Sequence, residues 1–63
     1  MSEIQRLRDE LQRRFPTSEA PRSVFVETEP KRAQVVLHQA AAQLGMMITT
    51  RNIDGALTVW RIK

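Results

Sequence analysis

The pair Asp54-Gly55 constrains the fold of this chain more than any other feature of the sequence. It lies within the final stretch Met46–Lys63, which reads MMITTRNIDGALTVWRIK. Asp-Gly suits the two positive-φ positions of a type I′ turn, and β-branched residues are frequent on both sides of it. The stretch therefore predicts a β-hairpin closed by a two-residue turn.

The length of the turn determines which residues face each other across the hairpin. One face holds the pairs Ile53–Ala56, Arg51–Thr58 and Thr49–Trp60, with Met47 and Ile62 beyond them. The other face holds the pairs Asn52–Leu57, Thr50–Val59 and Ile48–Arg61. We expect Ile48, Leu57 and Val59 to point to the core, because they form the aliphatic cluster. Trp60 and Arg51 would then share the outer face, and the competing interpretation makes Trp60 the main core aromatic.

The segment Ser2–Phe15 is predicted to be an amphipathic helix. Its apolar side chains recur at helical spacing, and they are Ile4, Leu7, Leu11 and Phe15. Ser2 with Gln5 fits a capping box at the start, and Pro16 ends the helix. The oppositely charged i,i+4 pairs, Arg6–Glu10 and Asp9–Arg13, are expected to form ion pairs.

Three further segments precede the hairpin. Residues 16–21 are a linker by composition, and residues 22–27 read as a strand with Phe25 on one face. Val24 and Val26 alternate with Phe25, so we expect both faces of this strand to be at least partly covered. A second helix is predicted from Pro30 to Leu44, capped by Thr28 or Glu29 and ended by Gly45. Its apolar face holds Ala33, Val36, Leu37, Ala40, Ala41 and Leu44.

These elements predict one α+β domain over residues 1–63, in the order helix, strand, helix, strand, strand. The helix between the first strand and the hairpin allows a crossover, so we expect a mixed sheet with both helices on one face. A chain of 63 residues buries only about 60% of its unfolded surface. A homodimer would supplement this small core.

Positive charge is concentrated in the second half of the chain. Residues 1–30 carry five basic and six acidic side chains, a net charge of −1, whereas residues 31–63 carry five basic and one acidic, a net charge of +4. Eight of the ten basic residues are Arg, the side chain best suited to forked contacts with phosphate or carboxylate. This pattern favours an anionic partner for the second helix and the hairpin.

Few features of the sequence suit catalysis or metal binding. His38 is the single His, Cys is absent, and no two carboxylates share an evident site. We therefore expect a protein that is not an enzyme and that has no metal or cofactor. No run is apolar enough to span a membrane, and without Cys or a signal-peptide pattern the expected location is cytoplasmic.

A helix-turn-helix motif is the main alternative fold for the second half. Ala41 and Gly45 have the spacing found around the turn of that motif. The recognition helix would then have to include residues 48–60, where β-branched Ile48-Thr49-Thr50 and the turn-forming Asp54-Gly55 oppose a helix.

The stretch His38–Met46, reading HQAAAQLGM, resembles part of the Arg-x-x-x-His single-stranded nucleic-acid-binding domain. In that domain a helix with a His, a following Ala and a closing Leu-Gly leads into a basic hairpin. Gln34 stands where the Arg of that motif would be. The resemblance implies a nucleic-acid-binding role for the second half of the chain.

A second resemblance covers about two-thirds of the chain and omits the first helix. It is to short phage-encoded proteins of unassigned role, and it rests on Ser23-Val24-Phe25-Val26, Leu44-Gly45-Met46, Thr50-Arg51, Asp54-Gly55 and Val59-Trp60-Arg61. Ala56, Thr58 and Glu27 depart from that pattern. The resemblance implies a phage or prophage origin, a host-cell cytoplasmic location and the order strand, helix, hairpin.

The sequence thus leads to a nucleic-acid-binding protein as the first hypothesis. Basic side chains would neutralise phosphates, and Trp60 would stack on an unpaired base. The candidate contact residues are Lys31, Arg32, His38, Arg51, Trp60, Arg61 and Lys63. The alternative is a phage-encoded modulator or inhibitor of a host protein, since a mixed-charge helix and a free hairpin edge both suit protein contact.

Overall fold

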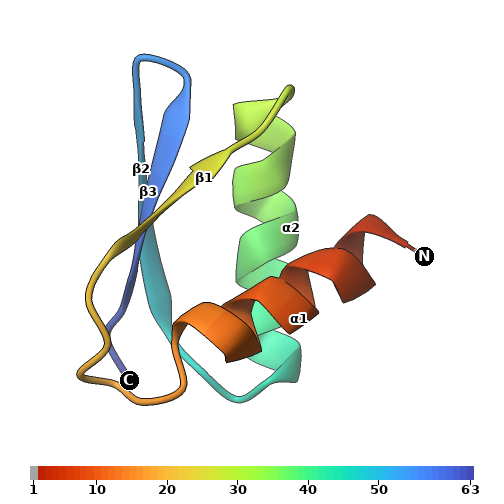
Figure 1. Cartoon of the computed structure of the whole chain (residues 1–63). Coiled ribbons are helices and arrows are strands. Elements are labelled where there is room, and N and C mark those ends of the chain that lie inside the picture. The colour runs from red at the N-terminus through yellow and green to blue at the C-terminus, as the bar shows by residue number, and fades with distance from the viewer. Residues whose placement is uncertain (1) are drawn as a thin grey trace.

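The computed structural model describes residues 2–63, and the first residue of the predicted domain, Met1, lies outside this range. The elements follow the expected order: α1 (Glu3–Arg14), β1 (Ser23–Val26), α2 (Pro30–Gln43), β2 (Ile48–Ile53) and β3 (Ala56–Arg61). Both helices lie on the same side of a three-stranded sheet (Figure 1). The predicted α+β fold is therefore confirmed.

The helix ends follow from local chemistry. The Ser2 hydroxyl accepts a hydrogen bond from the backbone N–H of Gln5 over 3.3 Å, so α1 has the predicted N-cap. At the start of α2, Pro30 occupies the first turn, and the N-cap residue Glu29 makes no side-chain capping bond. Gly45 follows the C-cap of α2 with φ of +70°, the left-handed conformation that Gly adopts at low cost.

The hairpin has the predicted turn and register. Asp54 and Gly55 have φ of 52° and 82°, which are the positive angles of a type I′ turn. Every predicted pair from Ile53–Ala56 to Ile48–Arg61 is present. Because residues 48–61 form two strands, the helix-turn-helix alternative is wrong.

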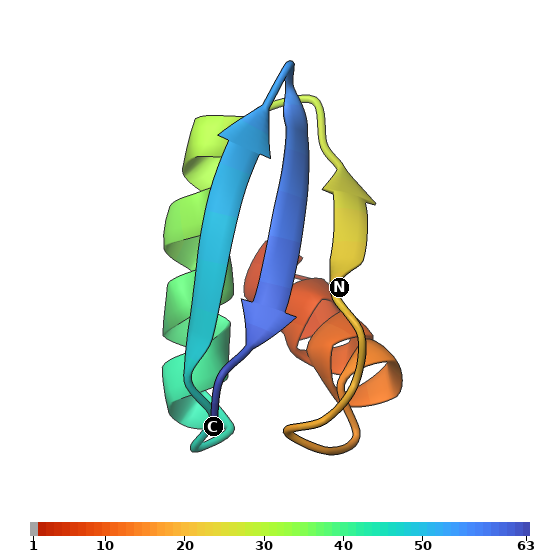
Figure 2. The same cartoon turned by 90° about the vertical axis from the view of Figure 1, so that its left-hand side faces the viewer.

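The expected mixed sheet is wrong, since the sheet is wholly antiparallel with the strand order β1-β3-β2. β1 and β2 run in the same direction, as the crossover through α2 requires, but β3 lies between them (Figure 2). This order places Phe25 of β1 opposite Leu57 of β3, so the aromatic ring reaches the core. The central strand thereby buries both of its inward aliphatic side chains, Leu57 and Val59.

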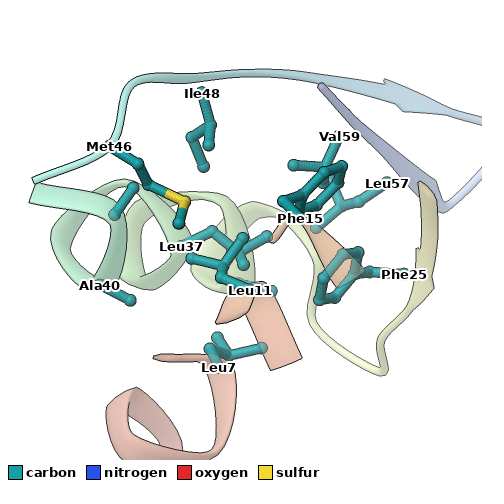
Figure 3. Close-up of a cluster of buried hydrophobic side chains, with 12 residues drawn as sticks. Leu7, Leu11, Phe15, Phe25, Leu37, Ala40, Met46, Ile48, Leu57 and Val59 are labelled. Atoms are coloured by element: carbon teal, nitrogen blue, oxygen red, sulfur yellow. The ribbon is translucent and has the colours of Figure 1, made fainter. Parts of the chain in front are cut away.

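One hydrophobic core lies between the helices and the inner face of the sheet (Figure 3). Its largest fully buried side chains are Phe15, Leu7, Leu11, Leu37, Leu57 and Val59. Ile48 is also buried, so the predicted inward face of the hairpin is confirmed. Three of the four alanines of α2, Ala33, Ala40 and Ala41, are buried as well, which allows close packing of this helix.

Two predicted ion pairs in α1 are replaced by other contacts. Arg6 pairs with Glu27 over 2.9 Å instead of with Glu10. Glu10 instead pairs with both Arg13 and Arg14. The Arg6 contact links α1 to the end of β1, a tertiary partner that helical spacing does not reveal.

Candidate functional site

The side of the sheet that faces away from both helices is open (Figures 1 and 2). We call this surface the outer sheet face. Its strand residues are Val24 and Val26 of β1, Thr49, Arg51 and Ile53 of β2, and Ala56, Thr58 and Trp60 of β3. Met47, just before β2, and Ile62, just after β3, belong to the same face. Arg51 is the single charged residue of this set, and the set contains no carboxylate.

Trp60 stands on the central strand of this face. It lies opposite Thr49 of β2 and is partly exposed. The core aromatics are instead Phe15 and Phe25, which are 0% and 3% exposed. The interpretation of Trp60 as the main core aromatic is therefore wrong.

Arg51 shares the outer sheet face with Trp60, as predicted. Arg51 is exposed and lies opposite Thr58, one outer-face pair away from Thr49 and Trp60. Diagonal neighbours in an antiparallel sheet are about 7–8 Å apart, within reach of long side chains. Arg51 makes no ion pair within residues 2–63, so the open surface carries a cation without an ion-pair partner as a diagonal neighbour of the indole.

Arg61 points to the opposite side of the sheet. Its Nη1 donates to the backbone oxygen of Phe15 over 2.9 Å, and its Nε donates to the backbone oxygen of Lys63 over 3.2 Å. Arg61 thus joins β3 to the end of α1. The expectation that Arg51 and Arg61 lie on opposite faces is confirmed.

His38 lies on α2, away from the outer sheet face. Its Nε2 lies 3.2 Å from Oγ1 of Thr50, and Nε2 of Gln34 donates to the same oxygen over 3.0 Å. Two side chains of α2 therefore contact the hydroxyl of Thr50. Gln34, four residues before His38, makes one of these two contacts.

The remaining predicted basic residues lie at the two ends of the sheet. Lys31 and Arg32 line a shallow open hollow beside Asn52, near the hairpin turn. Arg32 pairs with Glu3 over 3.2 Å and with Glu29 over 3.8 Å, which lowers its availability to an outside anion. Lys31 is exposed and makes no ion pair within residues 2–63, and Lys63 is exposed beyond the far end of β3.

The sequence did not single out the aliphatic part of this surface. The exposed fractions are 51% for Val24, 85% for Val26, 55% for Met47, 49% for Ile53 and 57% for Ile62. The expectation that both faces of β1 are at least partly covered is wrong, because α1 and α2 both pack on the side of Phe25. The sequence carries no signal of this exposure, because Val24, Phe25 and Val26 are all apolar.

Arg14 is a further basic residue, and it connects α1 to β1. Its Nη1 donates to the hydroxyl of Ser23 and to the backbone oxygen of Val24, each over 2.9 Å. The guanidinium also lies 4.3 Å from the centre of the Phe25 ring. These contacts connect α1 to β1, and the guanidinium charge is engaged with groups of the fold itself.

Within residues 2–63, no cluster of three or more His, Asp or Glu side chains is arranged to hold a metal ion. No helix in the same range is long and apolar enough to cross a membrane. The outer sheet face instead combines an aromatic ring, a free guanidinium and apolar area.

Comparisons with protein-family models, with curated proteins and with solved structures gave no match to the chain.

Proposed function

We propose that the protein binds nucleic acid through the outer sheet face and acts without enzymatic chemistry. The observation that carries the proposal is the position of Trp60, which is partly exposed on the central strand of an open sheet. An aromatic ring on such a platform stacks on an unpaired base, whichever base it is. Single-stranded nucleic acid is therefore the preferred ligand.

The charges around this platform suit a polyanion. Arg51 lies on the same face as Trp60, and that face has no carboxylate to repel phosphate. Lys63 lies at one end of the strands, and Lys31, on α2 behind the sheet, lies near the hairpin turn at the other end, where a strand that runs past the turn can reach it. Arg51, Lys31 and Lys63 are the proposed phosphate contacts.

The other predicted residues have lesser roles in this proposal. Arg32 is held by two carboxylates, and Arg61 is held by two backbone oxygens. His38 contacts Thr50. We assign these three residues mainly to the support of the surface.

Titration with labelled oligonucleotides tests the proposal. With about three phosphate contacts, the affinity for a single strand falls about tenfold to twentyfold between about 50 and 200 mM salt. Trp60 is the single Trp, so its fluorescence reports stacking directly and we expect it to be quenched by a single strand. Absence of binding to single and double strands even at low salt would overturn the proposal.

A second candidate function is binding to a host protein as a modulator or inhibitor. The five exposed aliphatic side chains of the outer sheet face favour it, because contiguous apolar area on a small protein marks a contact surface. Protein contact through these side chains depends weakly on salt, unlike phosphate contact.

Capture from a nuclease-treated host lysate distinguishes the two candidates. A protein partner is retained by the wild-type chain and by Lys31→Ala, but lost with Val26→Asp, which places a charge on the exposed apolar area. If nuclease treatment removes everything that the wild type captures, the protein-binding candidate fails.

A further inference from the structure

The two edges of the sheet differ in how well they are protected. β1 forms one edge and has only four residues, Ser23–Val26. Arg14 donates to the backbone oxygen of Val24 over 2.9 Å, so a side chain already occupies an acceptor of this edge. A short edge covered by a charged side chain resists the addition of another strand.

β2 forms the other edge, and it is longer; Ile48 at its start is buried, Thr50 is half-buried and Asn52 is exposed. It has six residues, Ile48–Ile53. The N–H of Ile62 donates to the backbone oxygen of Met47 over 2.8 Å, so the alternation of an antiparallel ladder turns the backbone groups of Thr49 and Arg51 toward β3. The backbone groups of the residues between them point away from the sheet.

The outward backbone groups are those of Ile48, Thr50 and Asn52. Within residues 2–63, no turn, cap or side-chain hydrogen bond reaches the backbone of Thr50 or Asn52. The side chains of these two residues do have partners, because Gln34 donates to Thr50 and Asn52 accepts from the N–H of Gly55. The edge therefore combines fixed side chains with free backbone donors and acceptors.

We propose that a second copy of this chain pairs with β2 in antiparallel fashion, around a two-fold axis at Thr50. Each copy would supply its β2 edge, and the two sheets would join into one continuous sheet. Such an interface is self-complementary, because the same strand lies on both sides of the axis.

The side chains of β2 select this register. With Thr50 opposite the partner's Thr50, Arg51 lies opposite the partner's Thr49, and Ile53 lies opposite the partner's Met47. Ile53 and Met47 are 49% and 55% exposed in the single chain, and pairing buries them against each other. A shift of the axis to Arg51 would place two like charges directly opposite, which is destabilising.

A second copy suits this edge better than a foreign strand. Ile48–Ile53 contains one charge, at Arg51. With the axis at Thr50, each Arg51 lies opposite the neutral hydroxyl of the partner's Thr49. The 63-residue chain has a small core of its own, and an added interface supplements it. The proposal is independent of nucleic-acid binding, because pairing uses the backbone of β2 and leaves the two outer sheet faces side by side.

Sedimentation and amide hydrogen exchange, both without nucleic acid, test the proposal. We expect the sedimentation coefficient to rise from monomer to dimer with concentration, and the exchange of the Thr50 and Asn52 amides to slow in parallel. A monomer at every concentration would overturn the proposal. A dimer in which these two amides stay fast while Val24 and Val26 are perturbed would also overturn it, since the contact would then be face to face.

Charge substitutions at Thr49 test the register without altering the core, because Thr49 is exposed. Thr49→Glu places a carboxylate opposite the partner's Arg51, and the two-fold axis creates two such pairs in the dimer. The dissociation constant of the dimer should therefore fall by about twofold to thirtyfold. Thr49→Arg should weaken it by a similar factor. The double variant Thr49→Arg with Arg51→Glu restores opposite charges and should recover the dimer, and equal dissociation constants for all of these variants would contradict the register.

Discussion

The guanidinium of Arg61 donates a hydrogen bond to the backbone oxygen of Phe15 over 2.9 Å. This contact joins the end of β3 to the C-cap of α1, which are 46 residues apart in the chain. The C-terminal carbonyls of a helix lack intrahelical partners, and a cation is favourable near them. The basic residue at the end of the hairpin thus serves the packing of the first helix.

Arg61→Ala is expected to destabilise the fold by about 1–3 kcal/mol, because it removes two hydrogen bonds from a charged donor. Urea denaturation measures the change. Arg61→Lys is the matched control, and it should recover only part of the loss, since an ammonium lacks the planar fork that reaches both oxygens. Unchanged stability combined with a large loss of oligonucleotide binding would assign Arg61 to the ligand instead.

Trp60→Ala is expected to weaken binding to a single-stranded oligonucleotide by about 1–3 kcal/mol, the usual value of stacking one base on an aromatic side chain. Fluorescence anisotropy of a labelled strand measures it, since the variant lacks the intrinsic probe. Trp60→Phe keeps a stacking surface and should retain much of the affinity. Equal affinities for wild type and Trp60→Ala would exclude stacking at this position.

Arg51→Ala and Arg32→Ala compare a free guanidinium with a paired one. Arg51 makes no ion pair within residues 2–63, whereas Arg32 contacts Glu3 and Glu29. Removal of one phosphate contact should lower the slope of log affinity against log salt by about 0.7 for a single strand. We expect this change for Arg51→Ala and a smaller one for Arg32→Ala, and the reverse order would place the ligand near the start of α2.

Local signals account for the parts of the fold that the sequence predicts. Asp54-Gly55 determines the hairpin register, because a two-residue turn leaves no choice of partners. Pro16 and Gly45 similarly determine where the helices end. The burial of Leu57 and Val59 follows once the register is known, because side chains alternate along a strand.

Long-range contacts account for the parts that the sequence does not predict. The pairing of β1 with β3 places Phe25 opposite Leu57. The sequence around either residue does not indicate that the two are partners. Glu27 as the partner of Arg6 is also a tertiary contact, so the helical i,i+4 rule selected the wrong carboxylate. The apolar extent of the candidate site was missed because Val24 and Val26 look like core residues until the helices are placed.

The stability of α1 should depend on pH through Glu10. The hydrogen bond from Arg13 holds the pKa of Glu10 below its ordinary value of 4.5, with Arg14 adding to the effect and partial burial opposing it. A lowered pKa in the folded state gives stability that is present above the unfolded pKa and is lost as pH falls through the folded one. Glu10→Gln should therefore cost less than about 1 kcal/mol at neutral pH.

Thermal or urea denaturation at several pH values checks this prediction. The difference between wild type and Glu10→Gln should shrink once the pH falls below about 4.5, the ordinary value. Asp9→Asn is the control, because Asp9 makes no ion pair within residues 2–63. A difference that grows toward acid pH would have the wrong sign for this ion pair.

The same substitution on the two sides of the sheet tests which face is covered. Val59 is fully buried on β3, whereas Val26 on β1 is 85% exposed. Replacement by Thr keeps the shape and exchanges one methyl group for a hydroxyl. At Val59 the buried hydroxyl loses its hydrogen bonds to water and lies among apolar side chains. Val59→Thr should therefore lower the free energy of unfolding by about 1–3 kcal/mol. Val26→Thr should stay within about 0.5 kcal/mol of wild type. Urea denaturation of both variants measures these values, and a larger cost at Val26 would mean that the outer sheet face is covered in solution.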